Sequence, residues 1–253
     1  MFARLLCLAT LSCALTATTA YGGTRDPNVP DHKHLEYGAK FRCVARIICR
    51  KESKLQHIAS CVIIAPRYVL TAAHAVGECD EFEIKLDTGE SFPLAAMTAH
   101  PSFGEDALKT TDVAVGRSAR EIPLDFYPPL YSKNDEAGKV VSIAGYGITG
   151  TFSTGATISD GHKRAGSNIV DAAADGKLVC SVSKGKRTSL EFLIGPGDSG
   201  GGLFIGNELC GIHSSVVHGR GEANISRYGH ESWHTRLSDA DIREWIDSVM
   251  AQK

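Results

Sequence analysis

The chain carries the stretch Gly195-Pro196-Gly197-Asp198-Ser199-Gly200-Gly201-Gly202, in which five glycines surround one serine. Glycine adopts backbone angles that are closed to other residues and lets another molecule approach the main chain closely. Such a loop can aim the amides of Gly197 and Ser199 at one point, where they would stabilise a developing oxyanion. A Gly-rich turn between strands and the nucleophile elbow of an α/β-hydrolase are the competing interpretations. The longer Gly-Asp-Ser-Gly-Gly string favours Ser199 as a catalytic nucleophile.

Two other segments offer the groups that a serine nucleophile needs, since its hydroxyl is activated by a base that a third group orients. Residues 69–75, Val-Leu-Thr-Ala-Ala-His-Ala, carry His74 at the end of an apolar run. Residues 110–115, Thr-Thr-Asp-Val-Ala-Val, open another apolar run with Asp112. Asp106 is an alternative acid, but it lacks the apolar run expected after it. We expect His74 to accept the serine proton and Asp112 to hold the histidine tautomer.

The order histidine, aspartate, serine along the chain differs from the orders in subtilisin and the α/β-hydrolases. The three segments resemble the motifs of the trypsin/chymotrypsin family of serine proteases, and the resemblance extends from about Phe41 to the C-terminus. It implies an all-β fold of two six-stranded barrels with the site between them. It also implies an endopeptidase that forms an acyl-enzyme on Ser199 and needs no cofactor. An esterase with the same triad and a catalytically silent, protease-like binding module are the alternatives.

Length and composition fit one or two globular domains with a substantial core, since the chain has 253 residues and a formal net charge of −2. The near-neutral balance gives no reason to expect a nucleic acid as a partner. The family resemblance implies protein or peptide substrates, and a monomer is predicted because nothing in the sequence points to an oligomer interface. No metal site is predicted, because the spacing of His218, His230 and His234 matches no strong ligand motif. Acidic residues within 78–83 fit either surface charge or a calcium loop of the kind found in the family.

The N-terminus has the features of an export signal. A positively charged start precedes the apolar run Leu5–Leu15, which is too short to span a membrane, and small residues at 18–20 suit cleavage. We therefore predict a signal peptide at 1–20 and a secreted or periplasmic protein that is not held in a membrane after signal removal. The mature chain would begin near Tyr21. The polar residues 21–40 are predicted to form an extended arm on the surface.

Asp198 needs a partner, because a buried unpaired carboxylate is costly. In many members of the family, a new N-terminus that begins Ile/Val-Val-Gly-Gly inserts and pairs with the aspartate before the nucleophile. The chain has no such sequence, and Tyr21-Gly22-Gly23 is the nearest match. Either signal removal creates the pairing amine, or another residue satisfies Asp198.

Six cysteines remain after the signal, namely Cys43, Cys49, Cys61, Cys79, Cys180 and Cys210. An even number in an exported chain predicts disulfides, although sequence does not resolve their pairing. The family usually joins a cysteine just after the catalytic histidine to a preceding strand, but those positions here hold Ala75 and Ala59. By the resemblance, a bridge between Cys61 and Cys79 would replace the usual one. A bridge between Cys180 and Cys210 is the second expectation.

Short β-rich segments separated by turns run through the chain, and helical periodicity is nearly absent before its end. The segments 41–50 and 57–64 flank a polar stretch and predict a hairpin. The first barrel is expected at about residues 41–122 and the second at about 137–236. Apolar residues at helical spacing then follow a serine N-cap and predict an amphipathic helix at about 238–251, packed on the second barrel.

Substrate preference depends on residues that the family places around a specificity pocket. The position six before the nucleophile is Leu193. An aspartate at this position would select Arg or Lys, and the chain does not have one there. The opposite wall would be Ser214, Ser215 and Val216, whose backbone would pair with the substrate as an added strand. His213 stands where several glutamyl endopeptidases carry a pocket histidine, but a histidine packed under the second barrel is equally consistent. We expect a preference for small or apolar residues, or for Glu, before the scissile bond.

Overall fold

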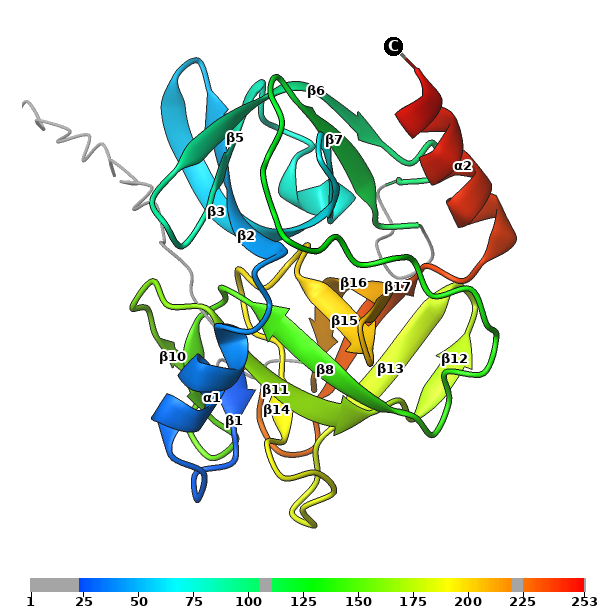
Figure 1. Ribbon diagram of the computed structural model, residues 1–253. Helices are drawn as coiled ribbons and strands as arrows, with labels where there is room; N and C mark the ends of the chain where they lie inside the picture. Colours follow the sequence, from blue (N-terminus) through cyan, green and yellow to red (C-terminus); the bar gives the residue numbers. More distant parts are fainter. Residues whose placement is uncertain (1–22, 105–110, 220–224, 253) are drawn as a thin grey trace, which may run out of the picture.

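The computed structural model describes residues 23–104, 111–219 and 225–252, which form two β-sheet units, one above the other in Figure 1. A helix lies near each end of this part of the chain, α1 (Asp31–Gly38) and α2 (Ala240–Ala251). Neither helix has the length and apolar character that a bilayer crossing needs. The predicted signal peptide lies outside the described residues.

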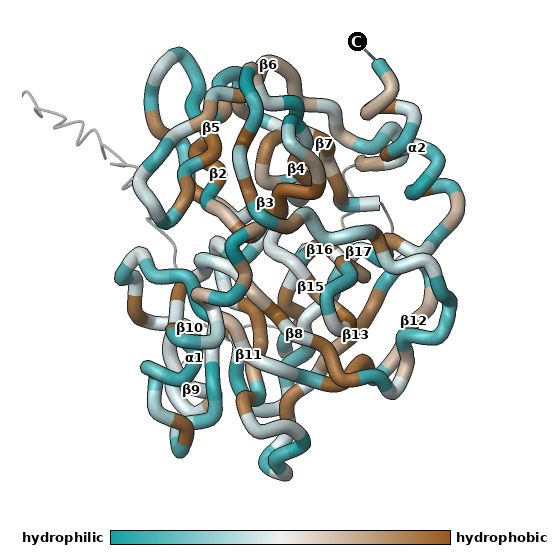
Figure 2. Tube along the Cα trace, viewed as in Figure 1, coloured by the Kyte–Doolittle hydropathy of each residue, from teal (hydrophilic) through white to brown (hydrophobic). Residues whose placement is uncertain are grey.

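The upper unit in Figure 1 is a closed six-stranded barrel with the strand order β2-β3-β4-β7-β6-β5. Its core includes Ile47, Ile63 and Phe92, which are fully buried. The predicted hairpin is confirmed as β2 and β3, and the turn between them, Glu52 and Ser53, has the positive φ angles typical of tight hairpins. Figure 2 shows that the tip of this hairpin is hydrophilic. The strands are β2 (Val44–Lys51), β3 (Lys54–Ala65), β4 (Tyr68–Thr71), β5 (Glu81–Lys85), β6 (Ser91–Ala99) and β7 (Ala114–Ser118).

The lower unit combines a seven-stranded sheet, in the order β11-β8-β15-β16-β17-β13-β12, with a four-stranded sheet, β10-β9-β1-β14. Two barrel-like sheets are therefore confirmed. The main sheet of the second has seven strands where six were predicted, because the short strand β12 folds back on β13. The strands are β1 (Thr24–Arg25), β8 (Val140–Gly145), β9 (Thr149–Thr151), β10 (Gly155–Ile158), β11 (Arg164–Ile169), β12 (Ala172–Ala174), β13 (Lys177–Ser181), β14 (Phe192–Leu193), β15 (Gly202–Ile205), β16 (Glu208–Val217) and β17 (Glu231–Arg236).

The described part of the N-terminal arm differs from the extended surface segment that was predicted. It contains the strand β1 and the helix α1, and Thr24 of β1 is fully buried. Thr24 pairs with Gly150 of β9 on one side and with Leu193 of β14 on the other. The hydroxyl of Thr24 donates to the carbonyl of Ser226 at 2.7 Å, so burial does not leave this polar side chain without a partner. The arm is thus built into the second unit.

The C-terminal helix is confirmed, but it lies on a different unit from the one predicted. Tyr68 of β4 donates its hydroxyl to the carbonyl of Met250 at 2.8 Å. The rings of His100 and Trp245 meet edge to face, with their centroids 4.7 Å apart. These contacts place α2 beside the first barrel, as Figure 1 also shows. Ile242 and Ile246 of the helix are buried in one apolar cluster with Leu70 of β4 and Val115 of β7.

Candidate active site

The three candidate catalytic residues lie where the two units meet. His74 lies in a single 3-10 turn, Ala73–Ala75, directly after β4, and Asp112 comes two residues before β7. Both belong to the first barrel. Ser199 lies in the loop between β14 and β15 of the second unit. The fold therefore brings together side chains that are up to 125 positions apart in the sequence.

The three side chains form one continuous hydrogen-bonded series. Ser199 Oγ lies 2.8 Å from His74 Nε2, and His74 Nδ1 lies 2.7 Å from Asp112 Oδ2. Because a carboxylate only accepts, Nδ1 carries the proton, which leaves Nε2 to accept from the serine hydroxyl. Asp112 Oδ1 also accepts the backbone N–H of His74 at 2.9 Å. The carboxylate therefore fixes both the ring and the main chain of the histidine.

Asp112 is buried and ionised. Its side chain is only 1% exposed. Burial alone would raise its pKa, but the hydrogen bonds and charge of His74, together with the Ser214 hydroxyl, hold the pKa below 3.8. Ser214 Oγ donates to Asp112 Oδ2 at 2.6 Å, a role for Ser214 that sequence did not suggest. The alternative acid, Asp106, lies outside the described residues.

The loop that carries Ser199 is held by the first barrel. Gly200 has a φ of 83°, and a Cβ atom there would lie 2.1 Å from Thr71 Oγ1, so only glycine fits. Ser60 of β3 donates its hydroxyl to the carbonyl of Gly197 at 3.0 Å and its amide to the carbonyl of Ser199 at 2.9 Å. These bonds fix the peptide planes around the two predicted oxyanion donors. Sequence reasoning missed Ser60, because a serine inside an apolar strand carries no signal of such a role.

Asp198 is held by three backbone donors. It is fully buried and accepts the amides of Gly23 at 2.8 Å, Gly147 at 2.6 Å and Gly195 at 2.8 Å. Burial raises its pKa to about 6, while these amides act in the opposite direction. Gly23 belongs to the arm, which therefore contacts the residue directly before the nucleophile. A Cβ atom on Gly23 would lie 2.3 Å from the carbonyl of Leu193, so this close approach also requires glycine.

The predicted pocket base is buried and apolar. Leu193 is fully buried and pairs with Thr24 of β1, and Ile194 beside it is only 2% exposed. On the predicted opposite wall, Ser214 is buried, whereas Ser215 and Val216 are half-buried. The wall residues therefore lie closer to solvent than the base does.

His213 lies inside the second unit. It is fully buried, and its Nδ1 lies 2.9 Å from Nδ1 of His234, which faces it on β17. Burial, followed by the charge of His234, lowers the pKa of His213 well below 6.5, so the ring is neutral at pH 7. A Cβ atom on Gly201 would lie 2.8 Å from its Cδ2. The ring thus packs under the serine loop, as in the buried alternative considered from the sequence.

A cavity of about 280 Å³ opens beside the candidate triad on the side of β3. His57, Ile58 and Ala59 of β3 form one wall. His74 and Ser199 reach into it from the other side, together with Ala75, Pro196 and Gly197. Sequence reasoning did not assign these β3 residues to the site, because their pattern is that of an ordinary barrel strand.

The six cysteines of the described residues are all free thiols. Cys61, which was expected to pair with Cys79, instead donates its thiol to the carbonyl of Ala45 at 3.6 Å. Cys79 lies beside Cys49, and their sulfur atoms and a ring nitrogen of His57 all lie within 4.8 Å of one another. The expected Cys61–Cys79 pairing therefore disagrees with the structure. The segment after His74 turns back toward β2, which carries Cys49, and away from the Cys61 end of β3. The expected Cys180–Cys210 bridge is likewise not present, although both cysteines lie in the core of the second unit.

Two solved structures share the architecture of this chain. The HL collagenase matches with a TM-score of 0.66 and 18% sequence identity, over 85% of this chain and 96% of the collagenase chain. Neuropsin, a serine protease expressed in the limbic system of mouse brain, matches with a TM-score of 0.66 and 18% identity, over 84% of this chain and 96% of its own. At this level of identity the likeness shows the fold. No curated protein matches the chain.

Fold and site together define a chymotrypsin-like serine protease. The family model for trypsin matches residues 33–240, which is most of the chain. The chain belongs to the trypsin family. It is a serine endopeptidase, a hydrolase whose substrates are peptides or proteins.

Proposed function

We propose that the chain is an exported endopeptidase that cleaves peptide bonds through an acyl-enzyme on Ser199. The observation that carries the proposal is the unbroken series from Ser199 Oγ through His74 to Asp112, with contacts of 2.8 and 2.7 Å. A serine next to a base that an ionised carboxylate orients is the arrangement that nucleophilic catalysis needs.

The proposed reaction has two halves. Ser199 Oγ attacks the scissile carbonyl carbon, and its proton passes to His74 Nε2. His74 then gives this proton to the leaving amine as the C–N bond breaks, which leaves the acyl group on Ser199. A water molecule then attacks the acyl carbon and loses a proton to His74. His74 passes this proton to Ser199 Oγ as the bond from Ser199 to the acyl carbon breaks and the new carboxyl end is released. Asp112 stays ionised throughout and stabilises the imidazolium.

The amides of Gly197 and Ser199 are the proposed oxyanion donors. Glycine at 197, with a φ of 87°, lets the loop turn sharply before the nucleophile. The two bonds from Ser60 and the burial of Asp198 hold the loop in one shape before substrate arrives. Fixed donors stabilise the transition state without reorganisation, which is why a rigid loop favours catalysis.

The exposed end of β16 is the proposed docking edge for substrate. Pairing of β16 with β15 ends at Ile212, whereas pairing with β17 continues to Val217. The backbone of Ser214, Ser215 and Val216 therefore has an edge from which an extended peptide could form an added strand. Such an edge would present the residue before the scissile bond toward Leu193.

A small or apolar residue before the scissile bond is the preference that the geometry supports best. The pocket base is Leu193 with Ile194, and neither offers a charge or a hydrogen-bond donor in its side chain. His213 is neutral, and its Nδ1 is already engaged by His234. A preference for Glu would need His213 to turn toward the pocket, and it is the second option.

Export would follow from the signal peptide predicted at residues 1–20, with the protein acting as a monomer free of the membrane. In an oxidising compartment, Cys49 and Cys79 are the proposed disulfide pair, because their sulfur atoms already lie within 4.8 Å. Oxidised glutathione would accept the two electrons and two protons that the thiols lose. Mass spectrometry of unreduced peptides tests this bridge, and alkylation of both thiols after exposure to the oxidant would refute it.

Cleavage of a peptide library by the purified protein tests the activity and the preference together, with Ser199→Ala as the control. Products that end in Ala, Val or Leu would support the apolar pocket, and products that end in Glu would favour His213. Labelling with an organophosphate separates a protease or esterase from a silent binding module. A chain that hydrolyses esters but no peptide would point to the esterase alternative, and one that never labels would exclude catalysis by Ser199.

A further inference from the structure

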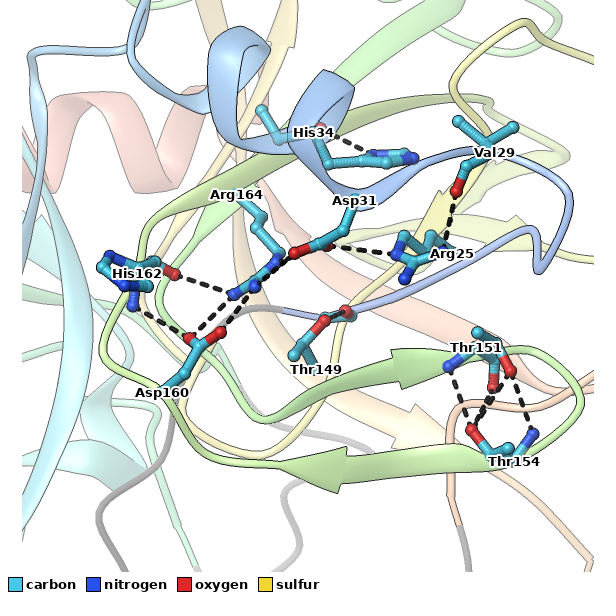
Figure 3. Close-up of polar contacts among 12 residues, drawn as sticks. Arg25, Val29, Asp31, His34, Thr149, Thr151, Thr154, Asp160, His162 and Arg164 are labelled. Atoms are coloured by element: carbon cyan, nitrogen blue, oxygen red, sulfur yellow. Dashed lines mark hydrogen bonds and ion pairs between the residues drawn. The ribbon is translucent and has the colours of Figure 1, made fainter.

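The helix α1 has no counterpart in the sequence expectations, and along the chain it follows the arm strand β1 and precedes β2 of the first barrel. Figure 3 shows the polar contacts that hold it. At their centre is Arg164, the first residue of β11, whose side chain is only 2% exposed. A guanidinium this deeply buried is stable only if carboxylates surround it. The carboxylates around Arg164 therefore show which segments of the chain this ion-pair cluster holds together.

Asp31, the first residue of α1, forms a bidentate ion pair with Arg164. The contacts are 2.8 Å from Nε to Oδ1 and 2.7 Å from Nη2 to Oδ2. The same Oδ1 also accepts Nε of Arg25, in β1, at 3.1 Å. Arg25 in turn donates to the carbonyl of Val29 at 2.7 Å and so closes the turn between β1 and α1. One carboxylate thus links the arm strand to the second unit.

Asp160 holds Arg164 from the other side, at 2.9 Å and 2.6 Å. It also accepts the amide of His162 at 3.1 Å, and His162 lies two residues before Arg164, the first residue of β11. Asp31 and Asp160 therefore make the same kind of bidentate contact with one guanidinium, but only Asp31 joins it to the arm. The two acids form a matched pair for experiment.

The helix also reaches the strand that leads to the nucleophile loop. His34 of α1 is fully buried, donates Nδ1 to the carbonyl of Ala165 at 3.0 Å and stacks on Phe192 of β14, with ring centroids 5.5 Å apart. At the C-terminal end of α1, a Cβ atom on Gly38 would lie 2.8 Å from the carbonyl of Lys163. The helix is therefore seated both on β14, which precedes the loop of Asp198, and on the start of β11.

Arg164 and Gly23 are each connected to Asp198 through the backbone. Arg164 faces Gly145 in the pairing of β11 with β8, and Gly147, two residues further along, donates its amide to Asp198. Gly23 donates to Asp198 from the arm, two residues before Arg25. The strand β1 has only two residues, which pair with β9 on one side and β14 on the other, and the carbonyl of Gly23 accepts the hydroxyl of Thr149 at 2.9 Å. Because this pairing is so short, the turn and the helix that follow β1 add a second attachment of the arm to the second unit.

We propose that Asp31 is a positioning residue for catalysis, because its ion pairs with Arg164 and Arg25 hold the arm so that the Gly23 amide reaches Asp198 and keeps the oxyanion loop in its active shape. The inference rests on the proposed use of Ser199 as nucleophile. Asp31 itself touches neither substrate nor the reacting atoms.

The test compares Asp31→Asn with Asp160→Asn in the full secreted chain. Each variant removes one charged partner from Arg164, so both should lower the melting temperature by a similar amount. Asp31→Asn should reduce kcat for a cleaved peptide by at least about tenfold, because weakening of oxyanion donors costs up to ~10²–10³-fold. Its KM should change little, since the substrate strand docks elsewhere. Asp160→Asn should keep kcat within about threefold of the wild type, and Asp31→Glu should restore part of the loss.

The rate of organophosphate labelling gives an independent readout on folded protein. Labelling of Asp31→Asn slowed to the same extent as kcat, with circular dichroism unchanged, would support the positioning role. Equal losses of kcat in Asp31→Asn and Asp160→Asn would reduce Asp31 to a structural residue and overturn the inference. A wild-type chain that neither labels nor cleaves peptides would instead count against the proposed function itself.

Discussion

Two buried aspartates near the candidate nucleophile have pKa values that are shifted in opposite directions. Asp112 has a pKa below 3.8, whereas the pKa of Asp198 is raised to about 6. Burial acts on both in the same direction, so the difference comes from their partners. Asp112 accepts from a histidine and a serine hydroxyl, and Asp198 accepts from three backbone amides.

The partners of each carboxylate determine the role that it can have. A partner that becomes positively charged during the reaction favours ionisation of Asp112, which suits a residue that must stabilise an imidazolium. Neutral amides offset only part of the burial of Asp198, which suits a residue that fixes the shape of a loop. Substitutions at and around the two carboxylates should separate these two tasks.

The largest effect is expected from Ser199→Ala, which removes the proposed nucleophile. Ser199 directly follows Asp198 in the chain and is linked to Asp112 through His74. Peptide cleavage should fall by about 10⁶-fold in kcat, while the fold and its melting temperature stay close to those of the wild type. Steady-state kinetics and thermal denaturation check this. A variant that still cleaved within a hundredfold of the wild type would remove Ser199 from the mechanism.

Asp112→Asn should reduce kcat by about 10⁴-fold, because an amide in place of the carboxylate lets the histidine adopt the wrong tautomer. The matched change Ser214→Ala leaves the carboxylate in place and removes one donor, so its effect should be much smaller. Kinetics with one peptide substrate on both variants makes the comparison. Equal losses would mean that the hydroxyl of Ser214, and not the charge of Asp112, is the important partner.

Unfolding at different pH values should reveal the opposite charge behaviour of the two aspartates. The pKa of Asp198 is higher in the folded chain, about 6 against 3.8, so its contribution to stability falls by about 3 kcal/mol as pH rises from about 4 to 6. The lowered pKa of Asp112 has the reverse sign, and its contribution is lost as pH falls toward and below 3.8.

Urea titrations from pH 3 to 7 measure both slopes, and Asp198→Asn and Asp112→Asn should each remove one of them. If Asp198→Asn leaves the dependence between pH 4 and 6 unchanged, another group titrates there. A chain that begins at Gly23 offers a further comparison. Its α-ammonium would lie next to Asp198 and should lower the pKa of that carboxyl.

The smallest effect is expected from Ser60→Ala. The hydroxyl of Ser60 accepts the amide of Tyr146 at 2.9 Å and donates to Gly197, so its loss leaves a buried N–H without that acceptor. Unfolding free energy should fall by about 1–3 kcal/mol. Ser248→Ala removes an exposed hydroxyl on α2 and serves as the control, with an expected change within about 0.5 kcal/mol. Equal losses in the two variants would show that Ser60 does not hold the loop.

Much of the fold could be predicted from the sequence, because barrel strands leave local signals. The hairpin of β2 and β3, the two β-sheet units and the C-terminal helix could be anticipated from residue type, spacing and the family resemblance. The candidate triad could also be found, since His74, Asp112 and Ser199 each stand in a distinctive local string. Their mutual distances then follow from the fold.

Features that depend on distant contacts could not be predicted. The arm is polar, and nothing in its composition indicates that Thr24 is buried between β9 and β14. The same holds for Ser60, whose role depends on a loop far along the chain. The cysteine pairing failed for a related reason. Proximity of Cys49 to Cys79 arises from how the chain turns after His74, and cysteine spacing does not encode that turn.

The position of β1 has a consequence for the order of events during synthesis. Gly23 is among the first described residues of the chain, but its partner Asp198 comes 175 positions later. Ribosomes release chains from the N-terminus, and contacts between distant positions form slowly. The arm therefore remains without Asp198, and without its strand partner β14, until most of the second unit has been made. A truncated chain that ends before Gly195 could still close its first barrel and bring His74 and Asp112 together, but the arm would have no aspartate to engage. Assembly of the candidate active site is therefore delayed until translation is nearly finished.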